Sequence, residues 1–218
     1  INKDAAEKVA SEIRDAGGKA QAFAVDLTSQ ESVVAAVNAA EAALGPTDVL
    51  VNNAGWDHAA PFLKTDKPLW EKIVAVNLYG ALYMHHAVLP GMSARGRGRV
   101  VNVASDAARV GSSGEAVYAF CKGGLVAFSK TMARELARKQ INVNVVCPGP
   151  TDTALFRDFA GEGEKGEKLK DALTKAIPFG RLGQPDDLPG IIAFLSSDEA
   201  SFITGQIISV SGGLTMAG

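Results

Sequence analysis

The sequence has little cysteine, almost no net charge and no long apolar run, and each absence excludes a class of protein. Its two cysteines, Cys121 and Cys147, lie among apolar residues, which predicts reduced thiols and no disulfide framework. With 22 basic and 24 acidic side chains, the formal charge of −2 gives no bias toward nucleic acid or anionic membranes. No stretch reaches the roughly 18 apolar residues that a membrane span needs. We expect a cytoplasmic protein without a nucleic-acid or membrane partner.

What the sequence does contain is a regular alternation of helical and strand patterns. This alternation predicts an α/β fold with a parallel sheet covered by helices on both faces. Pro90 and Gly91 should bend or break the end of one long helix. No linker divides the chain, so we expect a single domain over residues 1–218. The expected strands are 20–25, 48–52, 99–104, 141–147 and 207–210, and the expected helices are 3–16, 28–44, 68–93 and 117–138.

The sequence also lacks the glycine-rich turn through which such a sheet usually binds a dinucleotide. That turn follows the first strand and opens a helix. Gly96-Arg97-Gly98 precedes a strand instead, and the Gly111–Gly114 segment leads into a helix. The chain starts at Ile1 and enters a helical pattern almost at once. We therefore expect the first β-α-β segment to lie upstream of Ile1, in roughly 30–40 further residues.

Polar and glycine-rich segments follow the expected strands. Asp26, Asn52–Gly55, Ser105 and Pro148–Thr153 each stand at a strand's carboxyl end. In a parallel sheet these ends meet at one edge, where ligands bind. The sequence therefore predicts one site built from four separate segments.

Tyr118 and Lys122 are one helical turn apart, so their side chains share a helix face. A lysine cation there favours the phenolate and should lower the tyrosine pKa from about 10 toward neutrality. A tyrosine with such a pKa can donate or accept a proton near neutral pH. The Tyr-x-x-x-Lys pair is a weak signal alone, and Ser105 with the Asn-Asn-Ala-Gly turn makes it a strong one.

With these motifs, the chain resembles the short-chain dehydrogenase/reductase family over all 218 residues. Within that family it is most similar to the 2-hydroxycyclohexanecarboxyl-CoA dehydrogenases, through Asn53–Asp57, Ser105–Gly111 and Phe202–Gln206. The resemblance implies a Rossmann-like doubly wound sheet. It also implies an enzyme that interconverts a secondary alcohol and a ketone on a hydroxyacyl-CoA thioester. The family motifs are Asp26, Asn52–Gly55, Asn77, Ser105, Tyr118, Lys122 and Pro148–Thr153.

The resemblance implies a catalytic role for four residues. Tyr118 would be the acid or base at the carbonyl oxygen, and Ser105 would hydrogen-bond that oxygen. Lys122 would lower the pKa of Tyr118 and hold the nicotinamide ribose. Asn77 would hold a water that links Lys122 to solvent. Without the resemblance, a helix-interior amide bonded to backbone is the simpler interpretation of Asn77.

The same resemblance implies a nicotinamide cofactor, with NAD favoured over NADP. The residue that discriminates the two would fall just before Ile1. A turn of small residues lets the backbone approach such a ligand closely. The expected contacts are Asp26 and Leu27 at the adenine, Asn53, Ala54 and Gly55 beside the adenosine ribose, Pro148 and Gly149 at the nicotinamide, Thr151 at its carboxamide and Thr153 near the pyrophosphate, with Tyr118 and Lys122 completing the set.

Substrate contacts are expected from Trp56, Asp57 and Arg109, the arginine as a partner for an anionic CoA tail. For Asp57 the alternative is a surface pair with His58. For Arg109 the alternative is an ordinary exposed arginine. Residues 152–178, rich in Gly, Glu and Lys, predict a solvated surface loop that is compatible with a mobile lid. The His85-His86 pair predicts a packing or interface role and not a metal site, since adjacent helix residues point about 100° apart.

Two other functions remain open at this point. One is a 3-oxoacyl-(acyl carrier protein) reductase that uses NADPH. The other is a non-catalytic regulator that senses dinucleotides on the same fold, which the intact Ser105, Tyr118 and Lys122 disfavour. The family resemblance also implies a homotetramer that pairs the two long helices, 68–93 and 117–138.

Overall fold

The computed structural model of the protein describes residues 2–161 and 163–217. The predicted domain range includes Ile1, Glu162 and Gly218, which lie outside the described residues. The strands are β1 (Val49–Asn52), β2 (Gly98–Val103), β3 (Ile141–Pro148) and β4 (Ile207–Val210). The longer helices are α1 (Lys3–Asp15), α2 (Gln30–Leu44), α3 (Lys67–Val74), α4 (Gly80–Arg95), α6 (Ala116–Leu136), α8 (Glu164–Ala176) and α9 (Pro189–Ser196). The shorter helical segments are η1 (Phe62–Lys64), η2 (Ala75–Tyr79), α5 (Ala107–Val110), η3 (Ala137–Lys139), α7 (Ala154–Ala160), η4 (Pro185–Asp187) and η5 (Asp198–Ala200).

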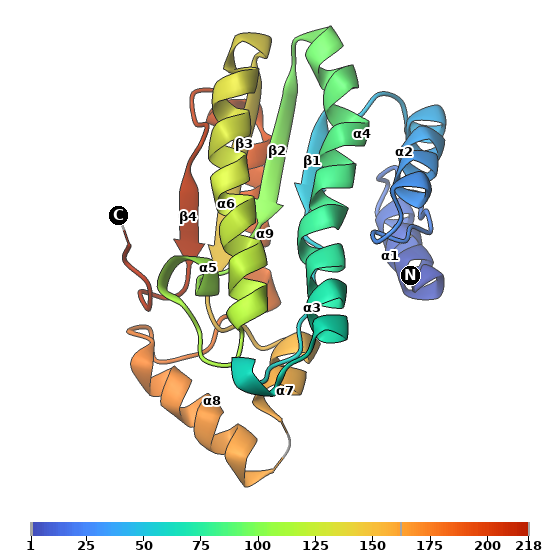
Figure 1. Ribbon diagram of the computed structural model, residues 1–218. Helices are drawn as coiled ribbons and strands as arrows, with labels where there is room; N and C mark the ends of the chain where they lie inside the picture. Colours follow the sequence, from blue (N-terminus) through green and yellow to red (C-terminus); the bar gives the residue numbers. More distant parts are fainter. Residues whose placement is uncertain (1, 162, 218) are drawn as a thin grey trace.

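The four strands form one parallel sheet in the order β1-β2-β3-β4. Helices α4 and α6 cover one face, α9 covers the other, and α2 packs beside α4 (Figure 1). β3 is buried along its length up to Pro148, as expected of a parallel strand with helices on both faces. The predicted α/β architecture with a doubly covered parallel sheet is confirmed. Among the described residues, no helix combines the length and apolar character needed to cross a membrane.

The prediction of a strand at residues 20–25 is wrong. This segment has no regular secondary structure, and its residues are half-buried or exposed. Val25 and Leu27 pack against the core between α2 and α4, but the segment has no partner strand among the described residues. A strand is stable only when a neighbour accepts and donates its backbone hydrogen bonds, and an apolar pattern alone cannot supply that neighbour.

The long helix predicted at 68–93 is present, but its interior differs from the prediction. A π-helical turn, η2, separates α3 from α4, and Asn77 lies in this turn. The helix does not break at Pro90, which lies inside α4, and it continues to Arg95. It ends at Gly96, whose φ of 67° is the left-handed conformation that glycine adopts easily.

The charge run predicted a surface loop over residues 152–178, and this prediction is wrong. Most of these residues form α7 and α8. Thr153 caps α7 by accepting a hydrogen bond from the Phe156 N–H at 3.1 Å. In α8, Leu169 and Leu173 lie four residues apart on one helix face, while Glu167, Lys168, Lys170 and Asp171 are exposed. The two helices lie below the carboxyl ends of the strands (Figure 1).

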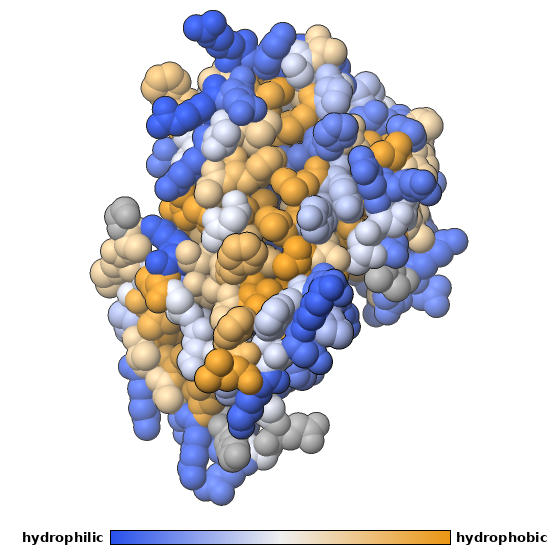
Figure 2. Space-filling model, in the orientation of Figure 1, coloured by the Kyte–Doolittle hydropathy of each residue, from blue (hydrophilic) through white to orange (hydrophobic). Residues whose placement is uncertain are grey.

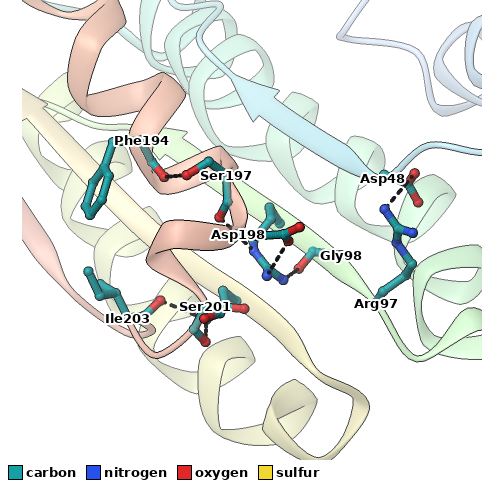
Figure 3. A network of polar contacts seen from close by, with 10 residues as sticks. Asp48, Arg97, Gly98, Phe194, Ser197, Asp198, Ser201 and Ile203 are labelled. Atoms are coloured by element: carbon teal, nitrogen blue, oxygen red, sulfur yellow. Dashed lines mark hydrogen bonds and ion pairs between the residues drawn. The ribbon is translucent and has the colours of Figure 1, made fainter.

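The opposite end of the sheet is held by a polar network (Figure 3). The Arg99 guanidinium at the start of β2 donates to Asp198 at 3.2 Å and to the Ser197 carbonyl at 3.4 Å. The Asn142 amide at the start of β3 donates to the Ser201 and Ile203 carbonyls, both at 2.9 Å. These contacts fix the segment around η5 to the sheet and leave the carboxyl edge free for a ligand.

A second polar network is buried between β1, β2, α4 and α6, and His85 lies at its centre, 2% exposed. His85 Nδ1 lies 2.7 Å from the Ala81 carbonyl, which can only accept, so Nδ1 carries the proton and Nε2 accepts from Asn102 at 3.2 Å. Asn102 also accepts from Asn52 at 2.8 Å and donates to Ser129 at 2.9 Å. The neutral imidazole therefore pairs with Ala81 and Asn102, while the Asn52 amide nitrogen, 3.4 Å from Nδ1, donates to Asn102 instead. The predicted packing role of His85 is confirmed.

This network makes folding stability sensitive to acid. Burial lowers the pKa of His85, so the unfolded chain takes up a proton at higher pH than the folded one. We expect the free energy of unfolding, measured with urea, to fall as the pH drops below about 6.5, the unperturbed histidine value. A protonated His85 would direct a second N–H at the Asn102 amide donor.

The controls are the two glutamine substitutions. His85→Gln should lower stability by about 1–3 kcal/mol at neutral pH and flatten the profile between pH 5.5 and 7.5. His86→Gln, at an exposed neighbouring position, should keep the wild-type profile. A pH slope that survives in His85→Gln would show that another group is responsible.

Candidate active site

A cavity of about 630 Å³ opens at the carboxyl ends of the strands. Its walls come from the turns after β1, β2 and β3, from the start of α6, and from α7 and α8. The structure brings ten of the residues predicted from the sequence together around it: Asn53, Gly55, Asp57, Ser105, Tyr118, Lys122, Pro148, Gly149, Thr151 and Thr153.

Ser105, Tyr118 and Lys122 line this cavity from two elements. Ser105 follows β2, and its hydroxyl accepts from the Ala107 N–H at 3.1 Å. Tyr118 and Lys122 lie on α6, and Lys122 Nζ is 5.6 Å from the centre of the Tyr118 ring. Both side chains are buried, at 9% and 3% exposure. A hydroxyl, a phenol and an ammonium thus converge on one cavity.

The predicted lowering of the Tyr118 pKa is wrong for the structure described. Burial raises the pKa of Tyr118, the carboxylates of Glu115 and Asp57 raise it further, and the hydrogen bond with Ser105 lowers it. Desolvation of the phenolate outweighs the helix-face proximity of Lys122. The sequence showed the spacing of the pair but not how deeply α6 buries it.

Lys122 is buried too, and burial lowers its pKa to about 8. Its ammonium donates to the Val103 carbonyl at 3.0 Å, at the end of β2. An ammonium has three donors, so Lys122 retains hydrogen-bonding capacity that can be directed into the cavity. A lysine with a pKa of about 8 can also exchange a proton near neutral pH.

Asn77 lies behind the cavity wall and clamps the Asn-Asn-Ala-Gly turn. Its amide nitrogen donates to the Trp56 carbonyl at 2.6 Å and to the Ile73 carbonyl at 2.9 Å, and its oxygen accepts from the Trp56 N–H at 3.1 Å. Both amide hydrogens therefore donate to backbone carbonyls, which is the arrangement expected of Asn77 without the family resemblance. A β-carbon on Gly55 would lie 3.0 Å from Asn77 Oδ1, which explains the need for glycine there.

The remaining predicted residues lie outside the cavity wall. Asp26 is exposed and accepts from the Thr28 N–H and hydroxyl, which together lower its pKa. Trp56 is half-buried beneath Lys72, whose ammonium is 3.6 Å from the ring centre. Arg109 turns toward β4 and the C-terminal segment, donating to the Ser209 hydroxyl at 2.9 Å and to the Ala217 carbonyl. Leu27 and Ala54 do not line the cavity either.

Two groups of lining residues were not predicted from the sequence. The acids Asp106, Glu115 and Asp158 line the cavity beside the expected Asp57. The others are apolar side chains of α7 and α8, whose helical spacing in the sequence was a usable signal: Leu155, Phe156, Phe159, Leu169 and Leu173. The cavity therefore has a polar inner wall and an apolar outer wall.

Comparison with known proteins gives the family of the chain. A family model described as enoyl-(acyl carrier protein) reductase matches residues 1–215. The chain is 43% identical over 189 residues to an acetoacetyl-CoA reductase of Shinella zoogloeoides, covering 86% of this chain and 76% of the relative. It is 33% identical over 216 residues to a 3-oxoacyl-[acyl-carrier-protein] reductase of Thermotoga maritima, covering 99% and 85%. The chain belongs to the short-chain dehydrogenase/reductase family.

A solved relative of this family extends the agreement to the fold. A gluconate 5-dehydrogenase from Burkholderia cenocepacia, in complex with NADP and tartrate, superimposes with a TM-score of 0.92 at 35% identity. The match covers 100% of this chain and 84% of that one. The chain is accordingly an oxidoreductase of CH–OH groups.

The residues around the cavity fit the nicotinamide cofactor that this family uses. The backbone approaches closely at Gly149, where a β-carbon would lie 2.7 Å from the Ser211 β-carbon. Lys122 offers donors that suit ribose hydroxyls. Thr151 donates to the Gly149 carbonyl at 2.9 Å, so its oxygen can still accept a hydrogen bond from an amide ligand.

The crowding at Gly149 can be tested directly. Gly149→Ala places a methyl group against Ser211, and we expect a loss of about 1–3 kcal/mol of stability from this overpacking. Gly190→Ala is the matched control, because nothing lies within 4 Å of its added β-carbon. Thermal unfolding should separate the two variants, with only Gly149→Ala melting lower than wild type. Equal melting temperatures would show that the turn at Gly149 can shift away from Ser211 without loss of stability.

Proposed function

We propose that the protein interconverts a secondary alcohol and a ketone on a hydroxyacyl thioester, with a 2-hydroxycyclohexanecarboxyl-CoA-like substrate as the leading candidate. The observation that carries the proposal is the convergence of Ser105, Tyr118 and Lys122 on one cavity at the carboxyl edge of the sheet. The acetoacetyl-CoA reductase among the relatives supports a CoA thioester. The apolar outer wall, with Phe156 and Leu173, suits an acyl chain or ring.

The proposed catalytic roles follow from the chemistry of the three side chains. Ser105 donates a hydrogen bond to the substrate oxygen and stabilises the charge that develops there. Tyr118 gives that oxygen a proton in reduction and removes it in oxidation. Lys122 returns the proton to Tyr118 or takes it up, as its pKa of about 8 allows. When bound, the nicotinamide supplies or accepts the hydride.

The proposed cofactor is NAD, with NADP as the alternative. Asn53, Gly55, Pro148, Gly149, Thr151 and Thr153 line the cavity in which the cofactor would bind. Asp26, Leu27 and Ala54 would contact the adenosine end outside this cavity. The proposed proton relay at Asn77 would use its backbone carbonyl, because both side-chain amide hydrogens are engaged.

We also propose that α7 and α8 act as a lid within residues 152–178. Apolar side chains of both helices face the cavity, and closing them over a substrate would exclude water from the hydride transfer. Part of the predicted lid, Glu162, lies outside the described residues.

A homotetramer is proposed from the family and from the exposed apolar face around α4 and α6. Figure 2 shows apolar side chains gathered over this face. Three large apolar side chains are about half exposed or more: Tyr79 at 49%, Val110 at 64% and Phe120 at 66%. Large apolar side chains in such a patch are typical of a surface that pairs with another subunit.

The substrate and cofactor are tested together by initial rates. The purified protein is assayed for oxidation of 2-hydroxycyclohexanecarboxyl-CoA and for reduction of acetoacetyl-CoA and an acetoacetyl carrier protein, each with both cofactors. We expect CoA thioesters to react at least about tenfold faster than the carrier-protein thioester, and with NAD(H). Preference for the carrier-protein substrate with NADPH would favour the alternative, a 3-oxoacyl-(acyl carrier protein) reductase.

The acid–base role is tested by Tyr118→Phe. Removing the hydroxyl takes away the proton donor, and we expect kcat to fall about 10²–10⁴-fold while cofactor affinity and melting temperature stay near wild type. Tyr79→Phe is the control at an exposed position and should keep full turnover. Full turnover by Tyr118→Phe would remove the acid–base assignment of Tyr118 and would show that another group transfers the proton.

A further inference from the structure

The inner wall of the cavity carries an unusual excess of carboxylates. Among its described lining residues, Asp57, Asp106, Glu115 and Asp158 are acidic, and Lys122 is the one lysine. His58 is the other titratable nitrogen in the wall. Because Lys122 is needed beside Tyr118, it leaves the other acids without a compensating cation in the cavity.

Asp106 shows the imbalance most clearly. It directly follows Ser105 and is only 4% exposed. One of its carboxylate oxygens accepts from the Ser209 hydroxyl, and the other, Oδ2, is buried without a hydrogen-bond partner. A β-carbon on Gly149 would lie 3.7 Å from this Oδ2, so the free oxygen lies beside the Pro148-Gly149 turn. Arg109 donates to Ser209 and not to Asp106.

Asp57 and Glu115 form a second acidic position on the other side of Tyr118. Both oxygens of Asp57 are buried, and beside them only the neighbouring His58, chiefly through its backbone, favours the charged carboxylate. The two acids also line a common void of about 10 Å³, and the backbones beside them are joined by the Ala60 N–H to Gly114 carbonyl bond at 2.9 Å. Burial raises the pKa of each acid, and the charge of Asp57 raises that of Glu115 further. Negative charge is therefore already costly at this position.

From this arrangement we infer that Asp57, Asp106 and Glu115 restrict the reacting end of the substrate pocket to uncharged groups. The inference rests on the proposed function and narrows its substrate class. A carboxylate near the reacting carbon would add a further anion to a desolvated wall of anions, which is strongly unfavourable.

The number of carboxylates in the cavity does not by itself explain a preference for uncharged substrates, because the effect of each carboxylate depends on its exposure to solvent. Asp158 lines the same cavity from α7, but its side chain is exposed. Solvent screens an exposed carboxylate, so its repulsion of a substrate anion is weak. Asp158 is therefore a matched control for the buried Asp106 and the half-buried Asp57 and Glu115: the same charge is removed from the same cavity.

The test uses a pair of probes that differ in charge at one position, acetoacetate and methyl acetoacetate. We expect the wild-type protein to prefer the neutral ester by at least about 100-fold in kcat/KM, and Glu115→Gln and Asp106→Asn each to reduce this preference about tenfold. Asp158→Asn should leave the ratio within about twofold of wild type. Asp106→Asn keeps an oxygen that can accept the hydrogen bond from Ser209. If Asp106→Asn does not fold, Glu115→Gln alone tests the inference.

Two results would overturn the inference: similar kcat/KM for both probes in the wild type, or an unchanged ratio in Glu115→Gln. Failure of the proposed function looks different, because acetoacetyl-CoA and both probes would then all fail to react. In that case the two probes are compared as ligands of the cofactor-loaded protein by ligand-observed NMR. The same preference, and the same loss in Glu115→Gln, is then expected in the ratio of Kd values.

Discussion

The position of every group at the candidate active site depends on the pairing of β2 with β1 and β3. Parallel pairing in register places Asn52 opposite Asn102 and Val103 opposite Val146, so three strands end at one level. The buried hydrogen bond from Asn52 to Asn102 adds a side-chain link to the backbone ladder. The carbonyl of Val103 then receives Lys122, and Ser105 follows two residues later. A shift of one residue in β2 would turn these groups away from the cavity.

The same pairing explains why the edge that binds ligand is polar while the sheet beneath it is apolar. Strands buried on both faces can expose chemistry only where they end. At that edge the structure places four carboxylates, a lysine with a pKa of about 8 and a tyrosine whose pKa is raised by burial. Desolvation is the common cause. It keeps Tyr118 protonated, brings Lys122 into a range where it exchanges protons at neutral pH, and makes further negative charge costly.

Much of the fold and of the site was predictable from the sequence, because the signals involved are local. The apolar pattern of 141–147 needed no knowledge of its neighbours, and the Tyr118–Lys122 spacing is a property of one helix. The failures concern features that depend on contacts distant in sequence. The segment 20–25 has a strand pattern but no described partner strand, and the direction of the Tyr118 pKa depends on burial beneath other elements. Helix α8 was missed because its charge run obscured the apolar pair Leu169 and Leu173.

Asn77 shows how one residue can satisfy two interpretations of a sequence. Its side chain is a helix-interior amide bonded to backbone, yet the backbone that it holds belongs to the Trp56 turn at the cavity. The π-helical turn at η2 accompanies this arrangement, because its i→i+5 bonding adds a residue to the turn and so changes the direction of a side chain within a continuous helix. The hydrogen bonds of Asn77 thus fix the geometry of the turn beside Gly55, which lines the cavity. For Asn77 the structural interpretation and the proposed role at the site are therefore not alternatives, since the same hydrogen bonds fit both.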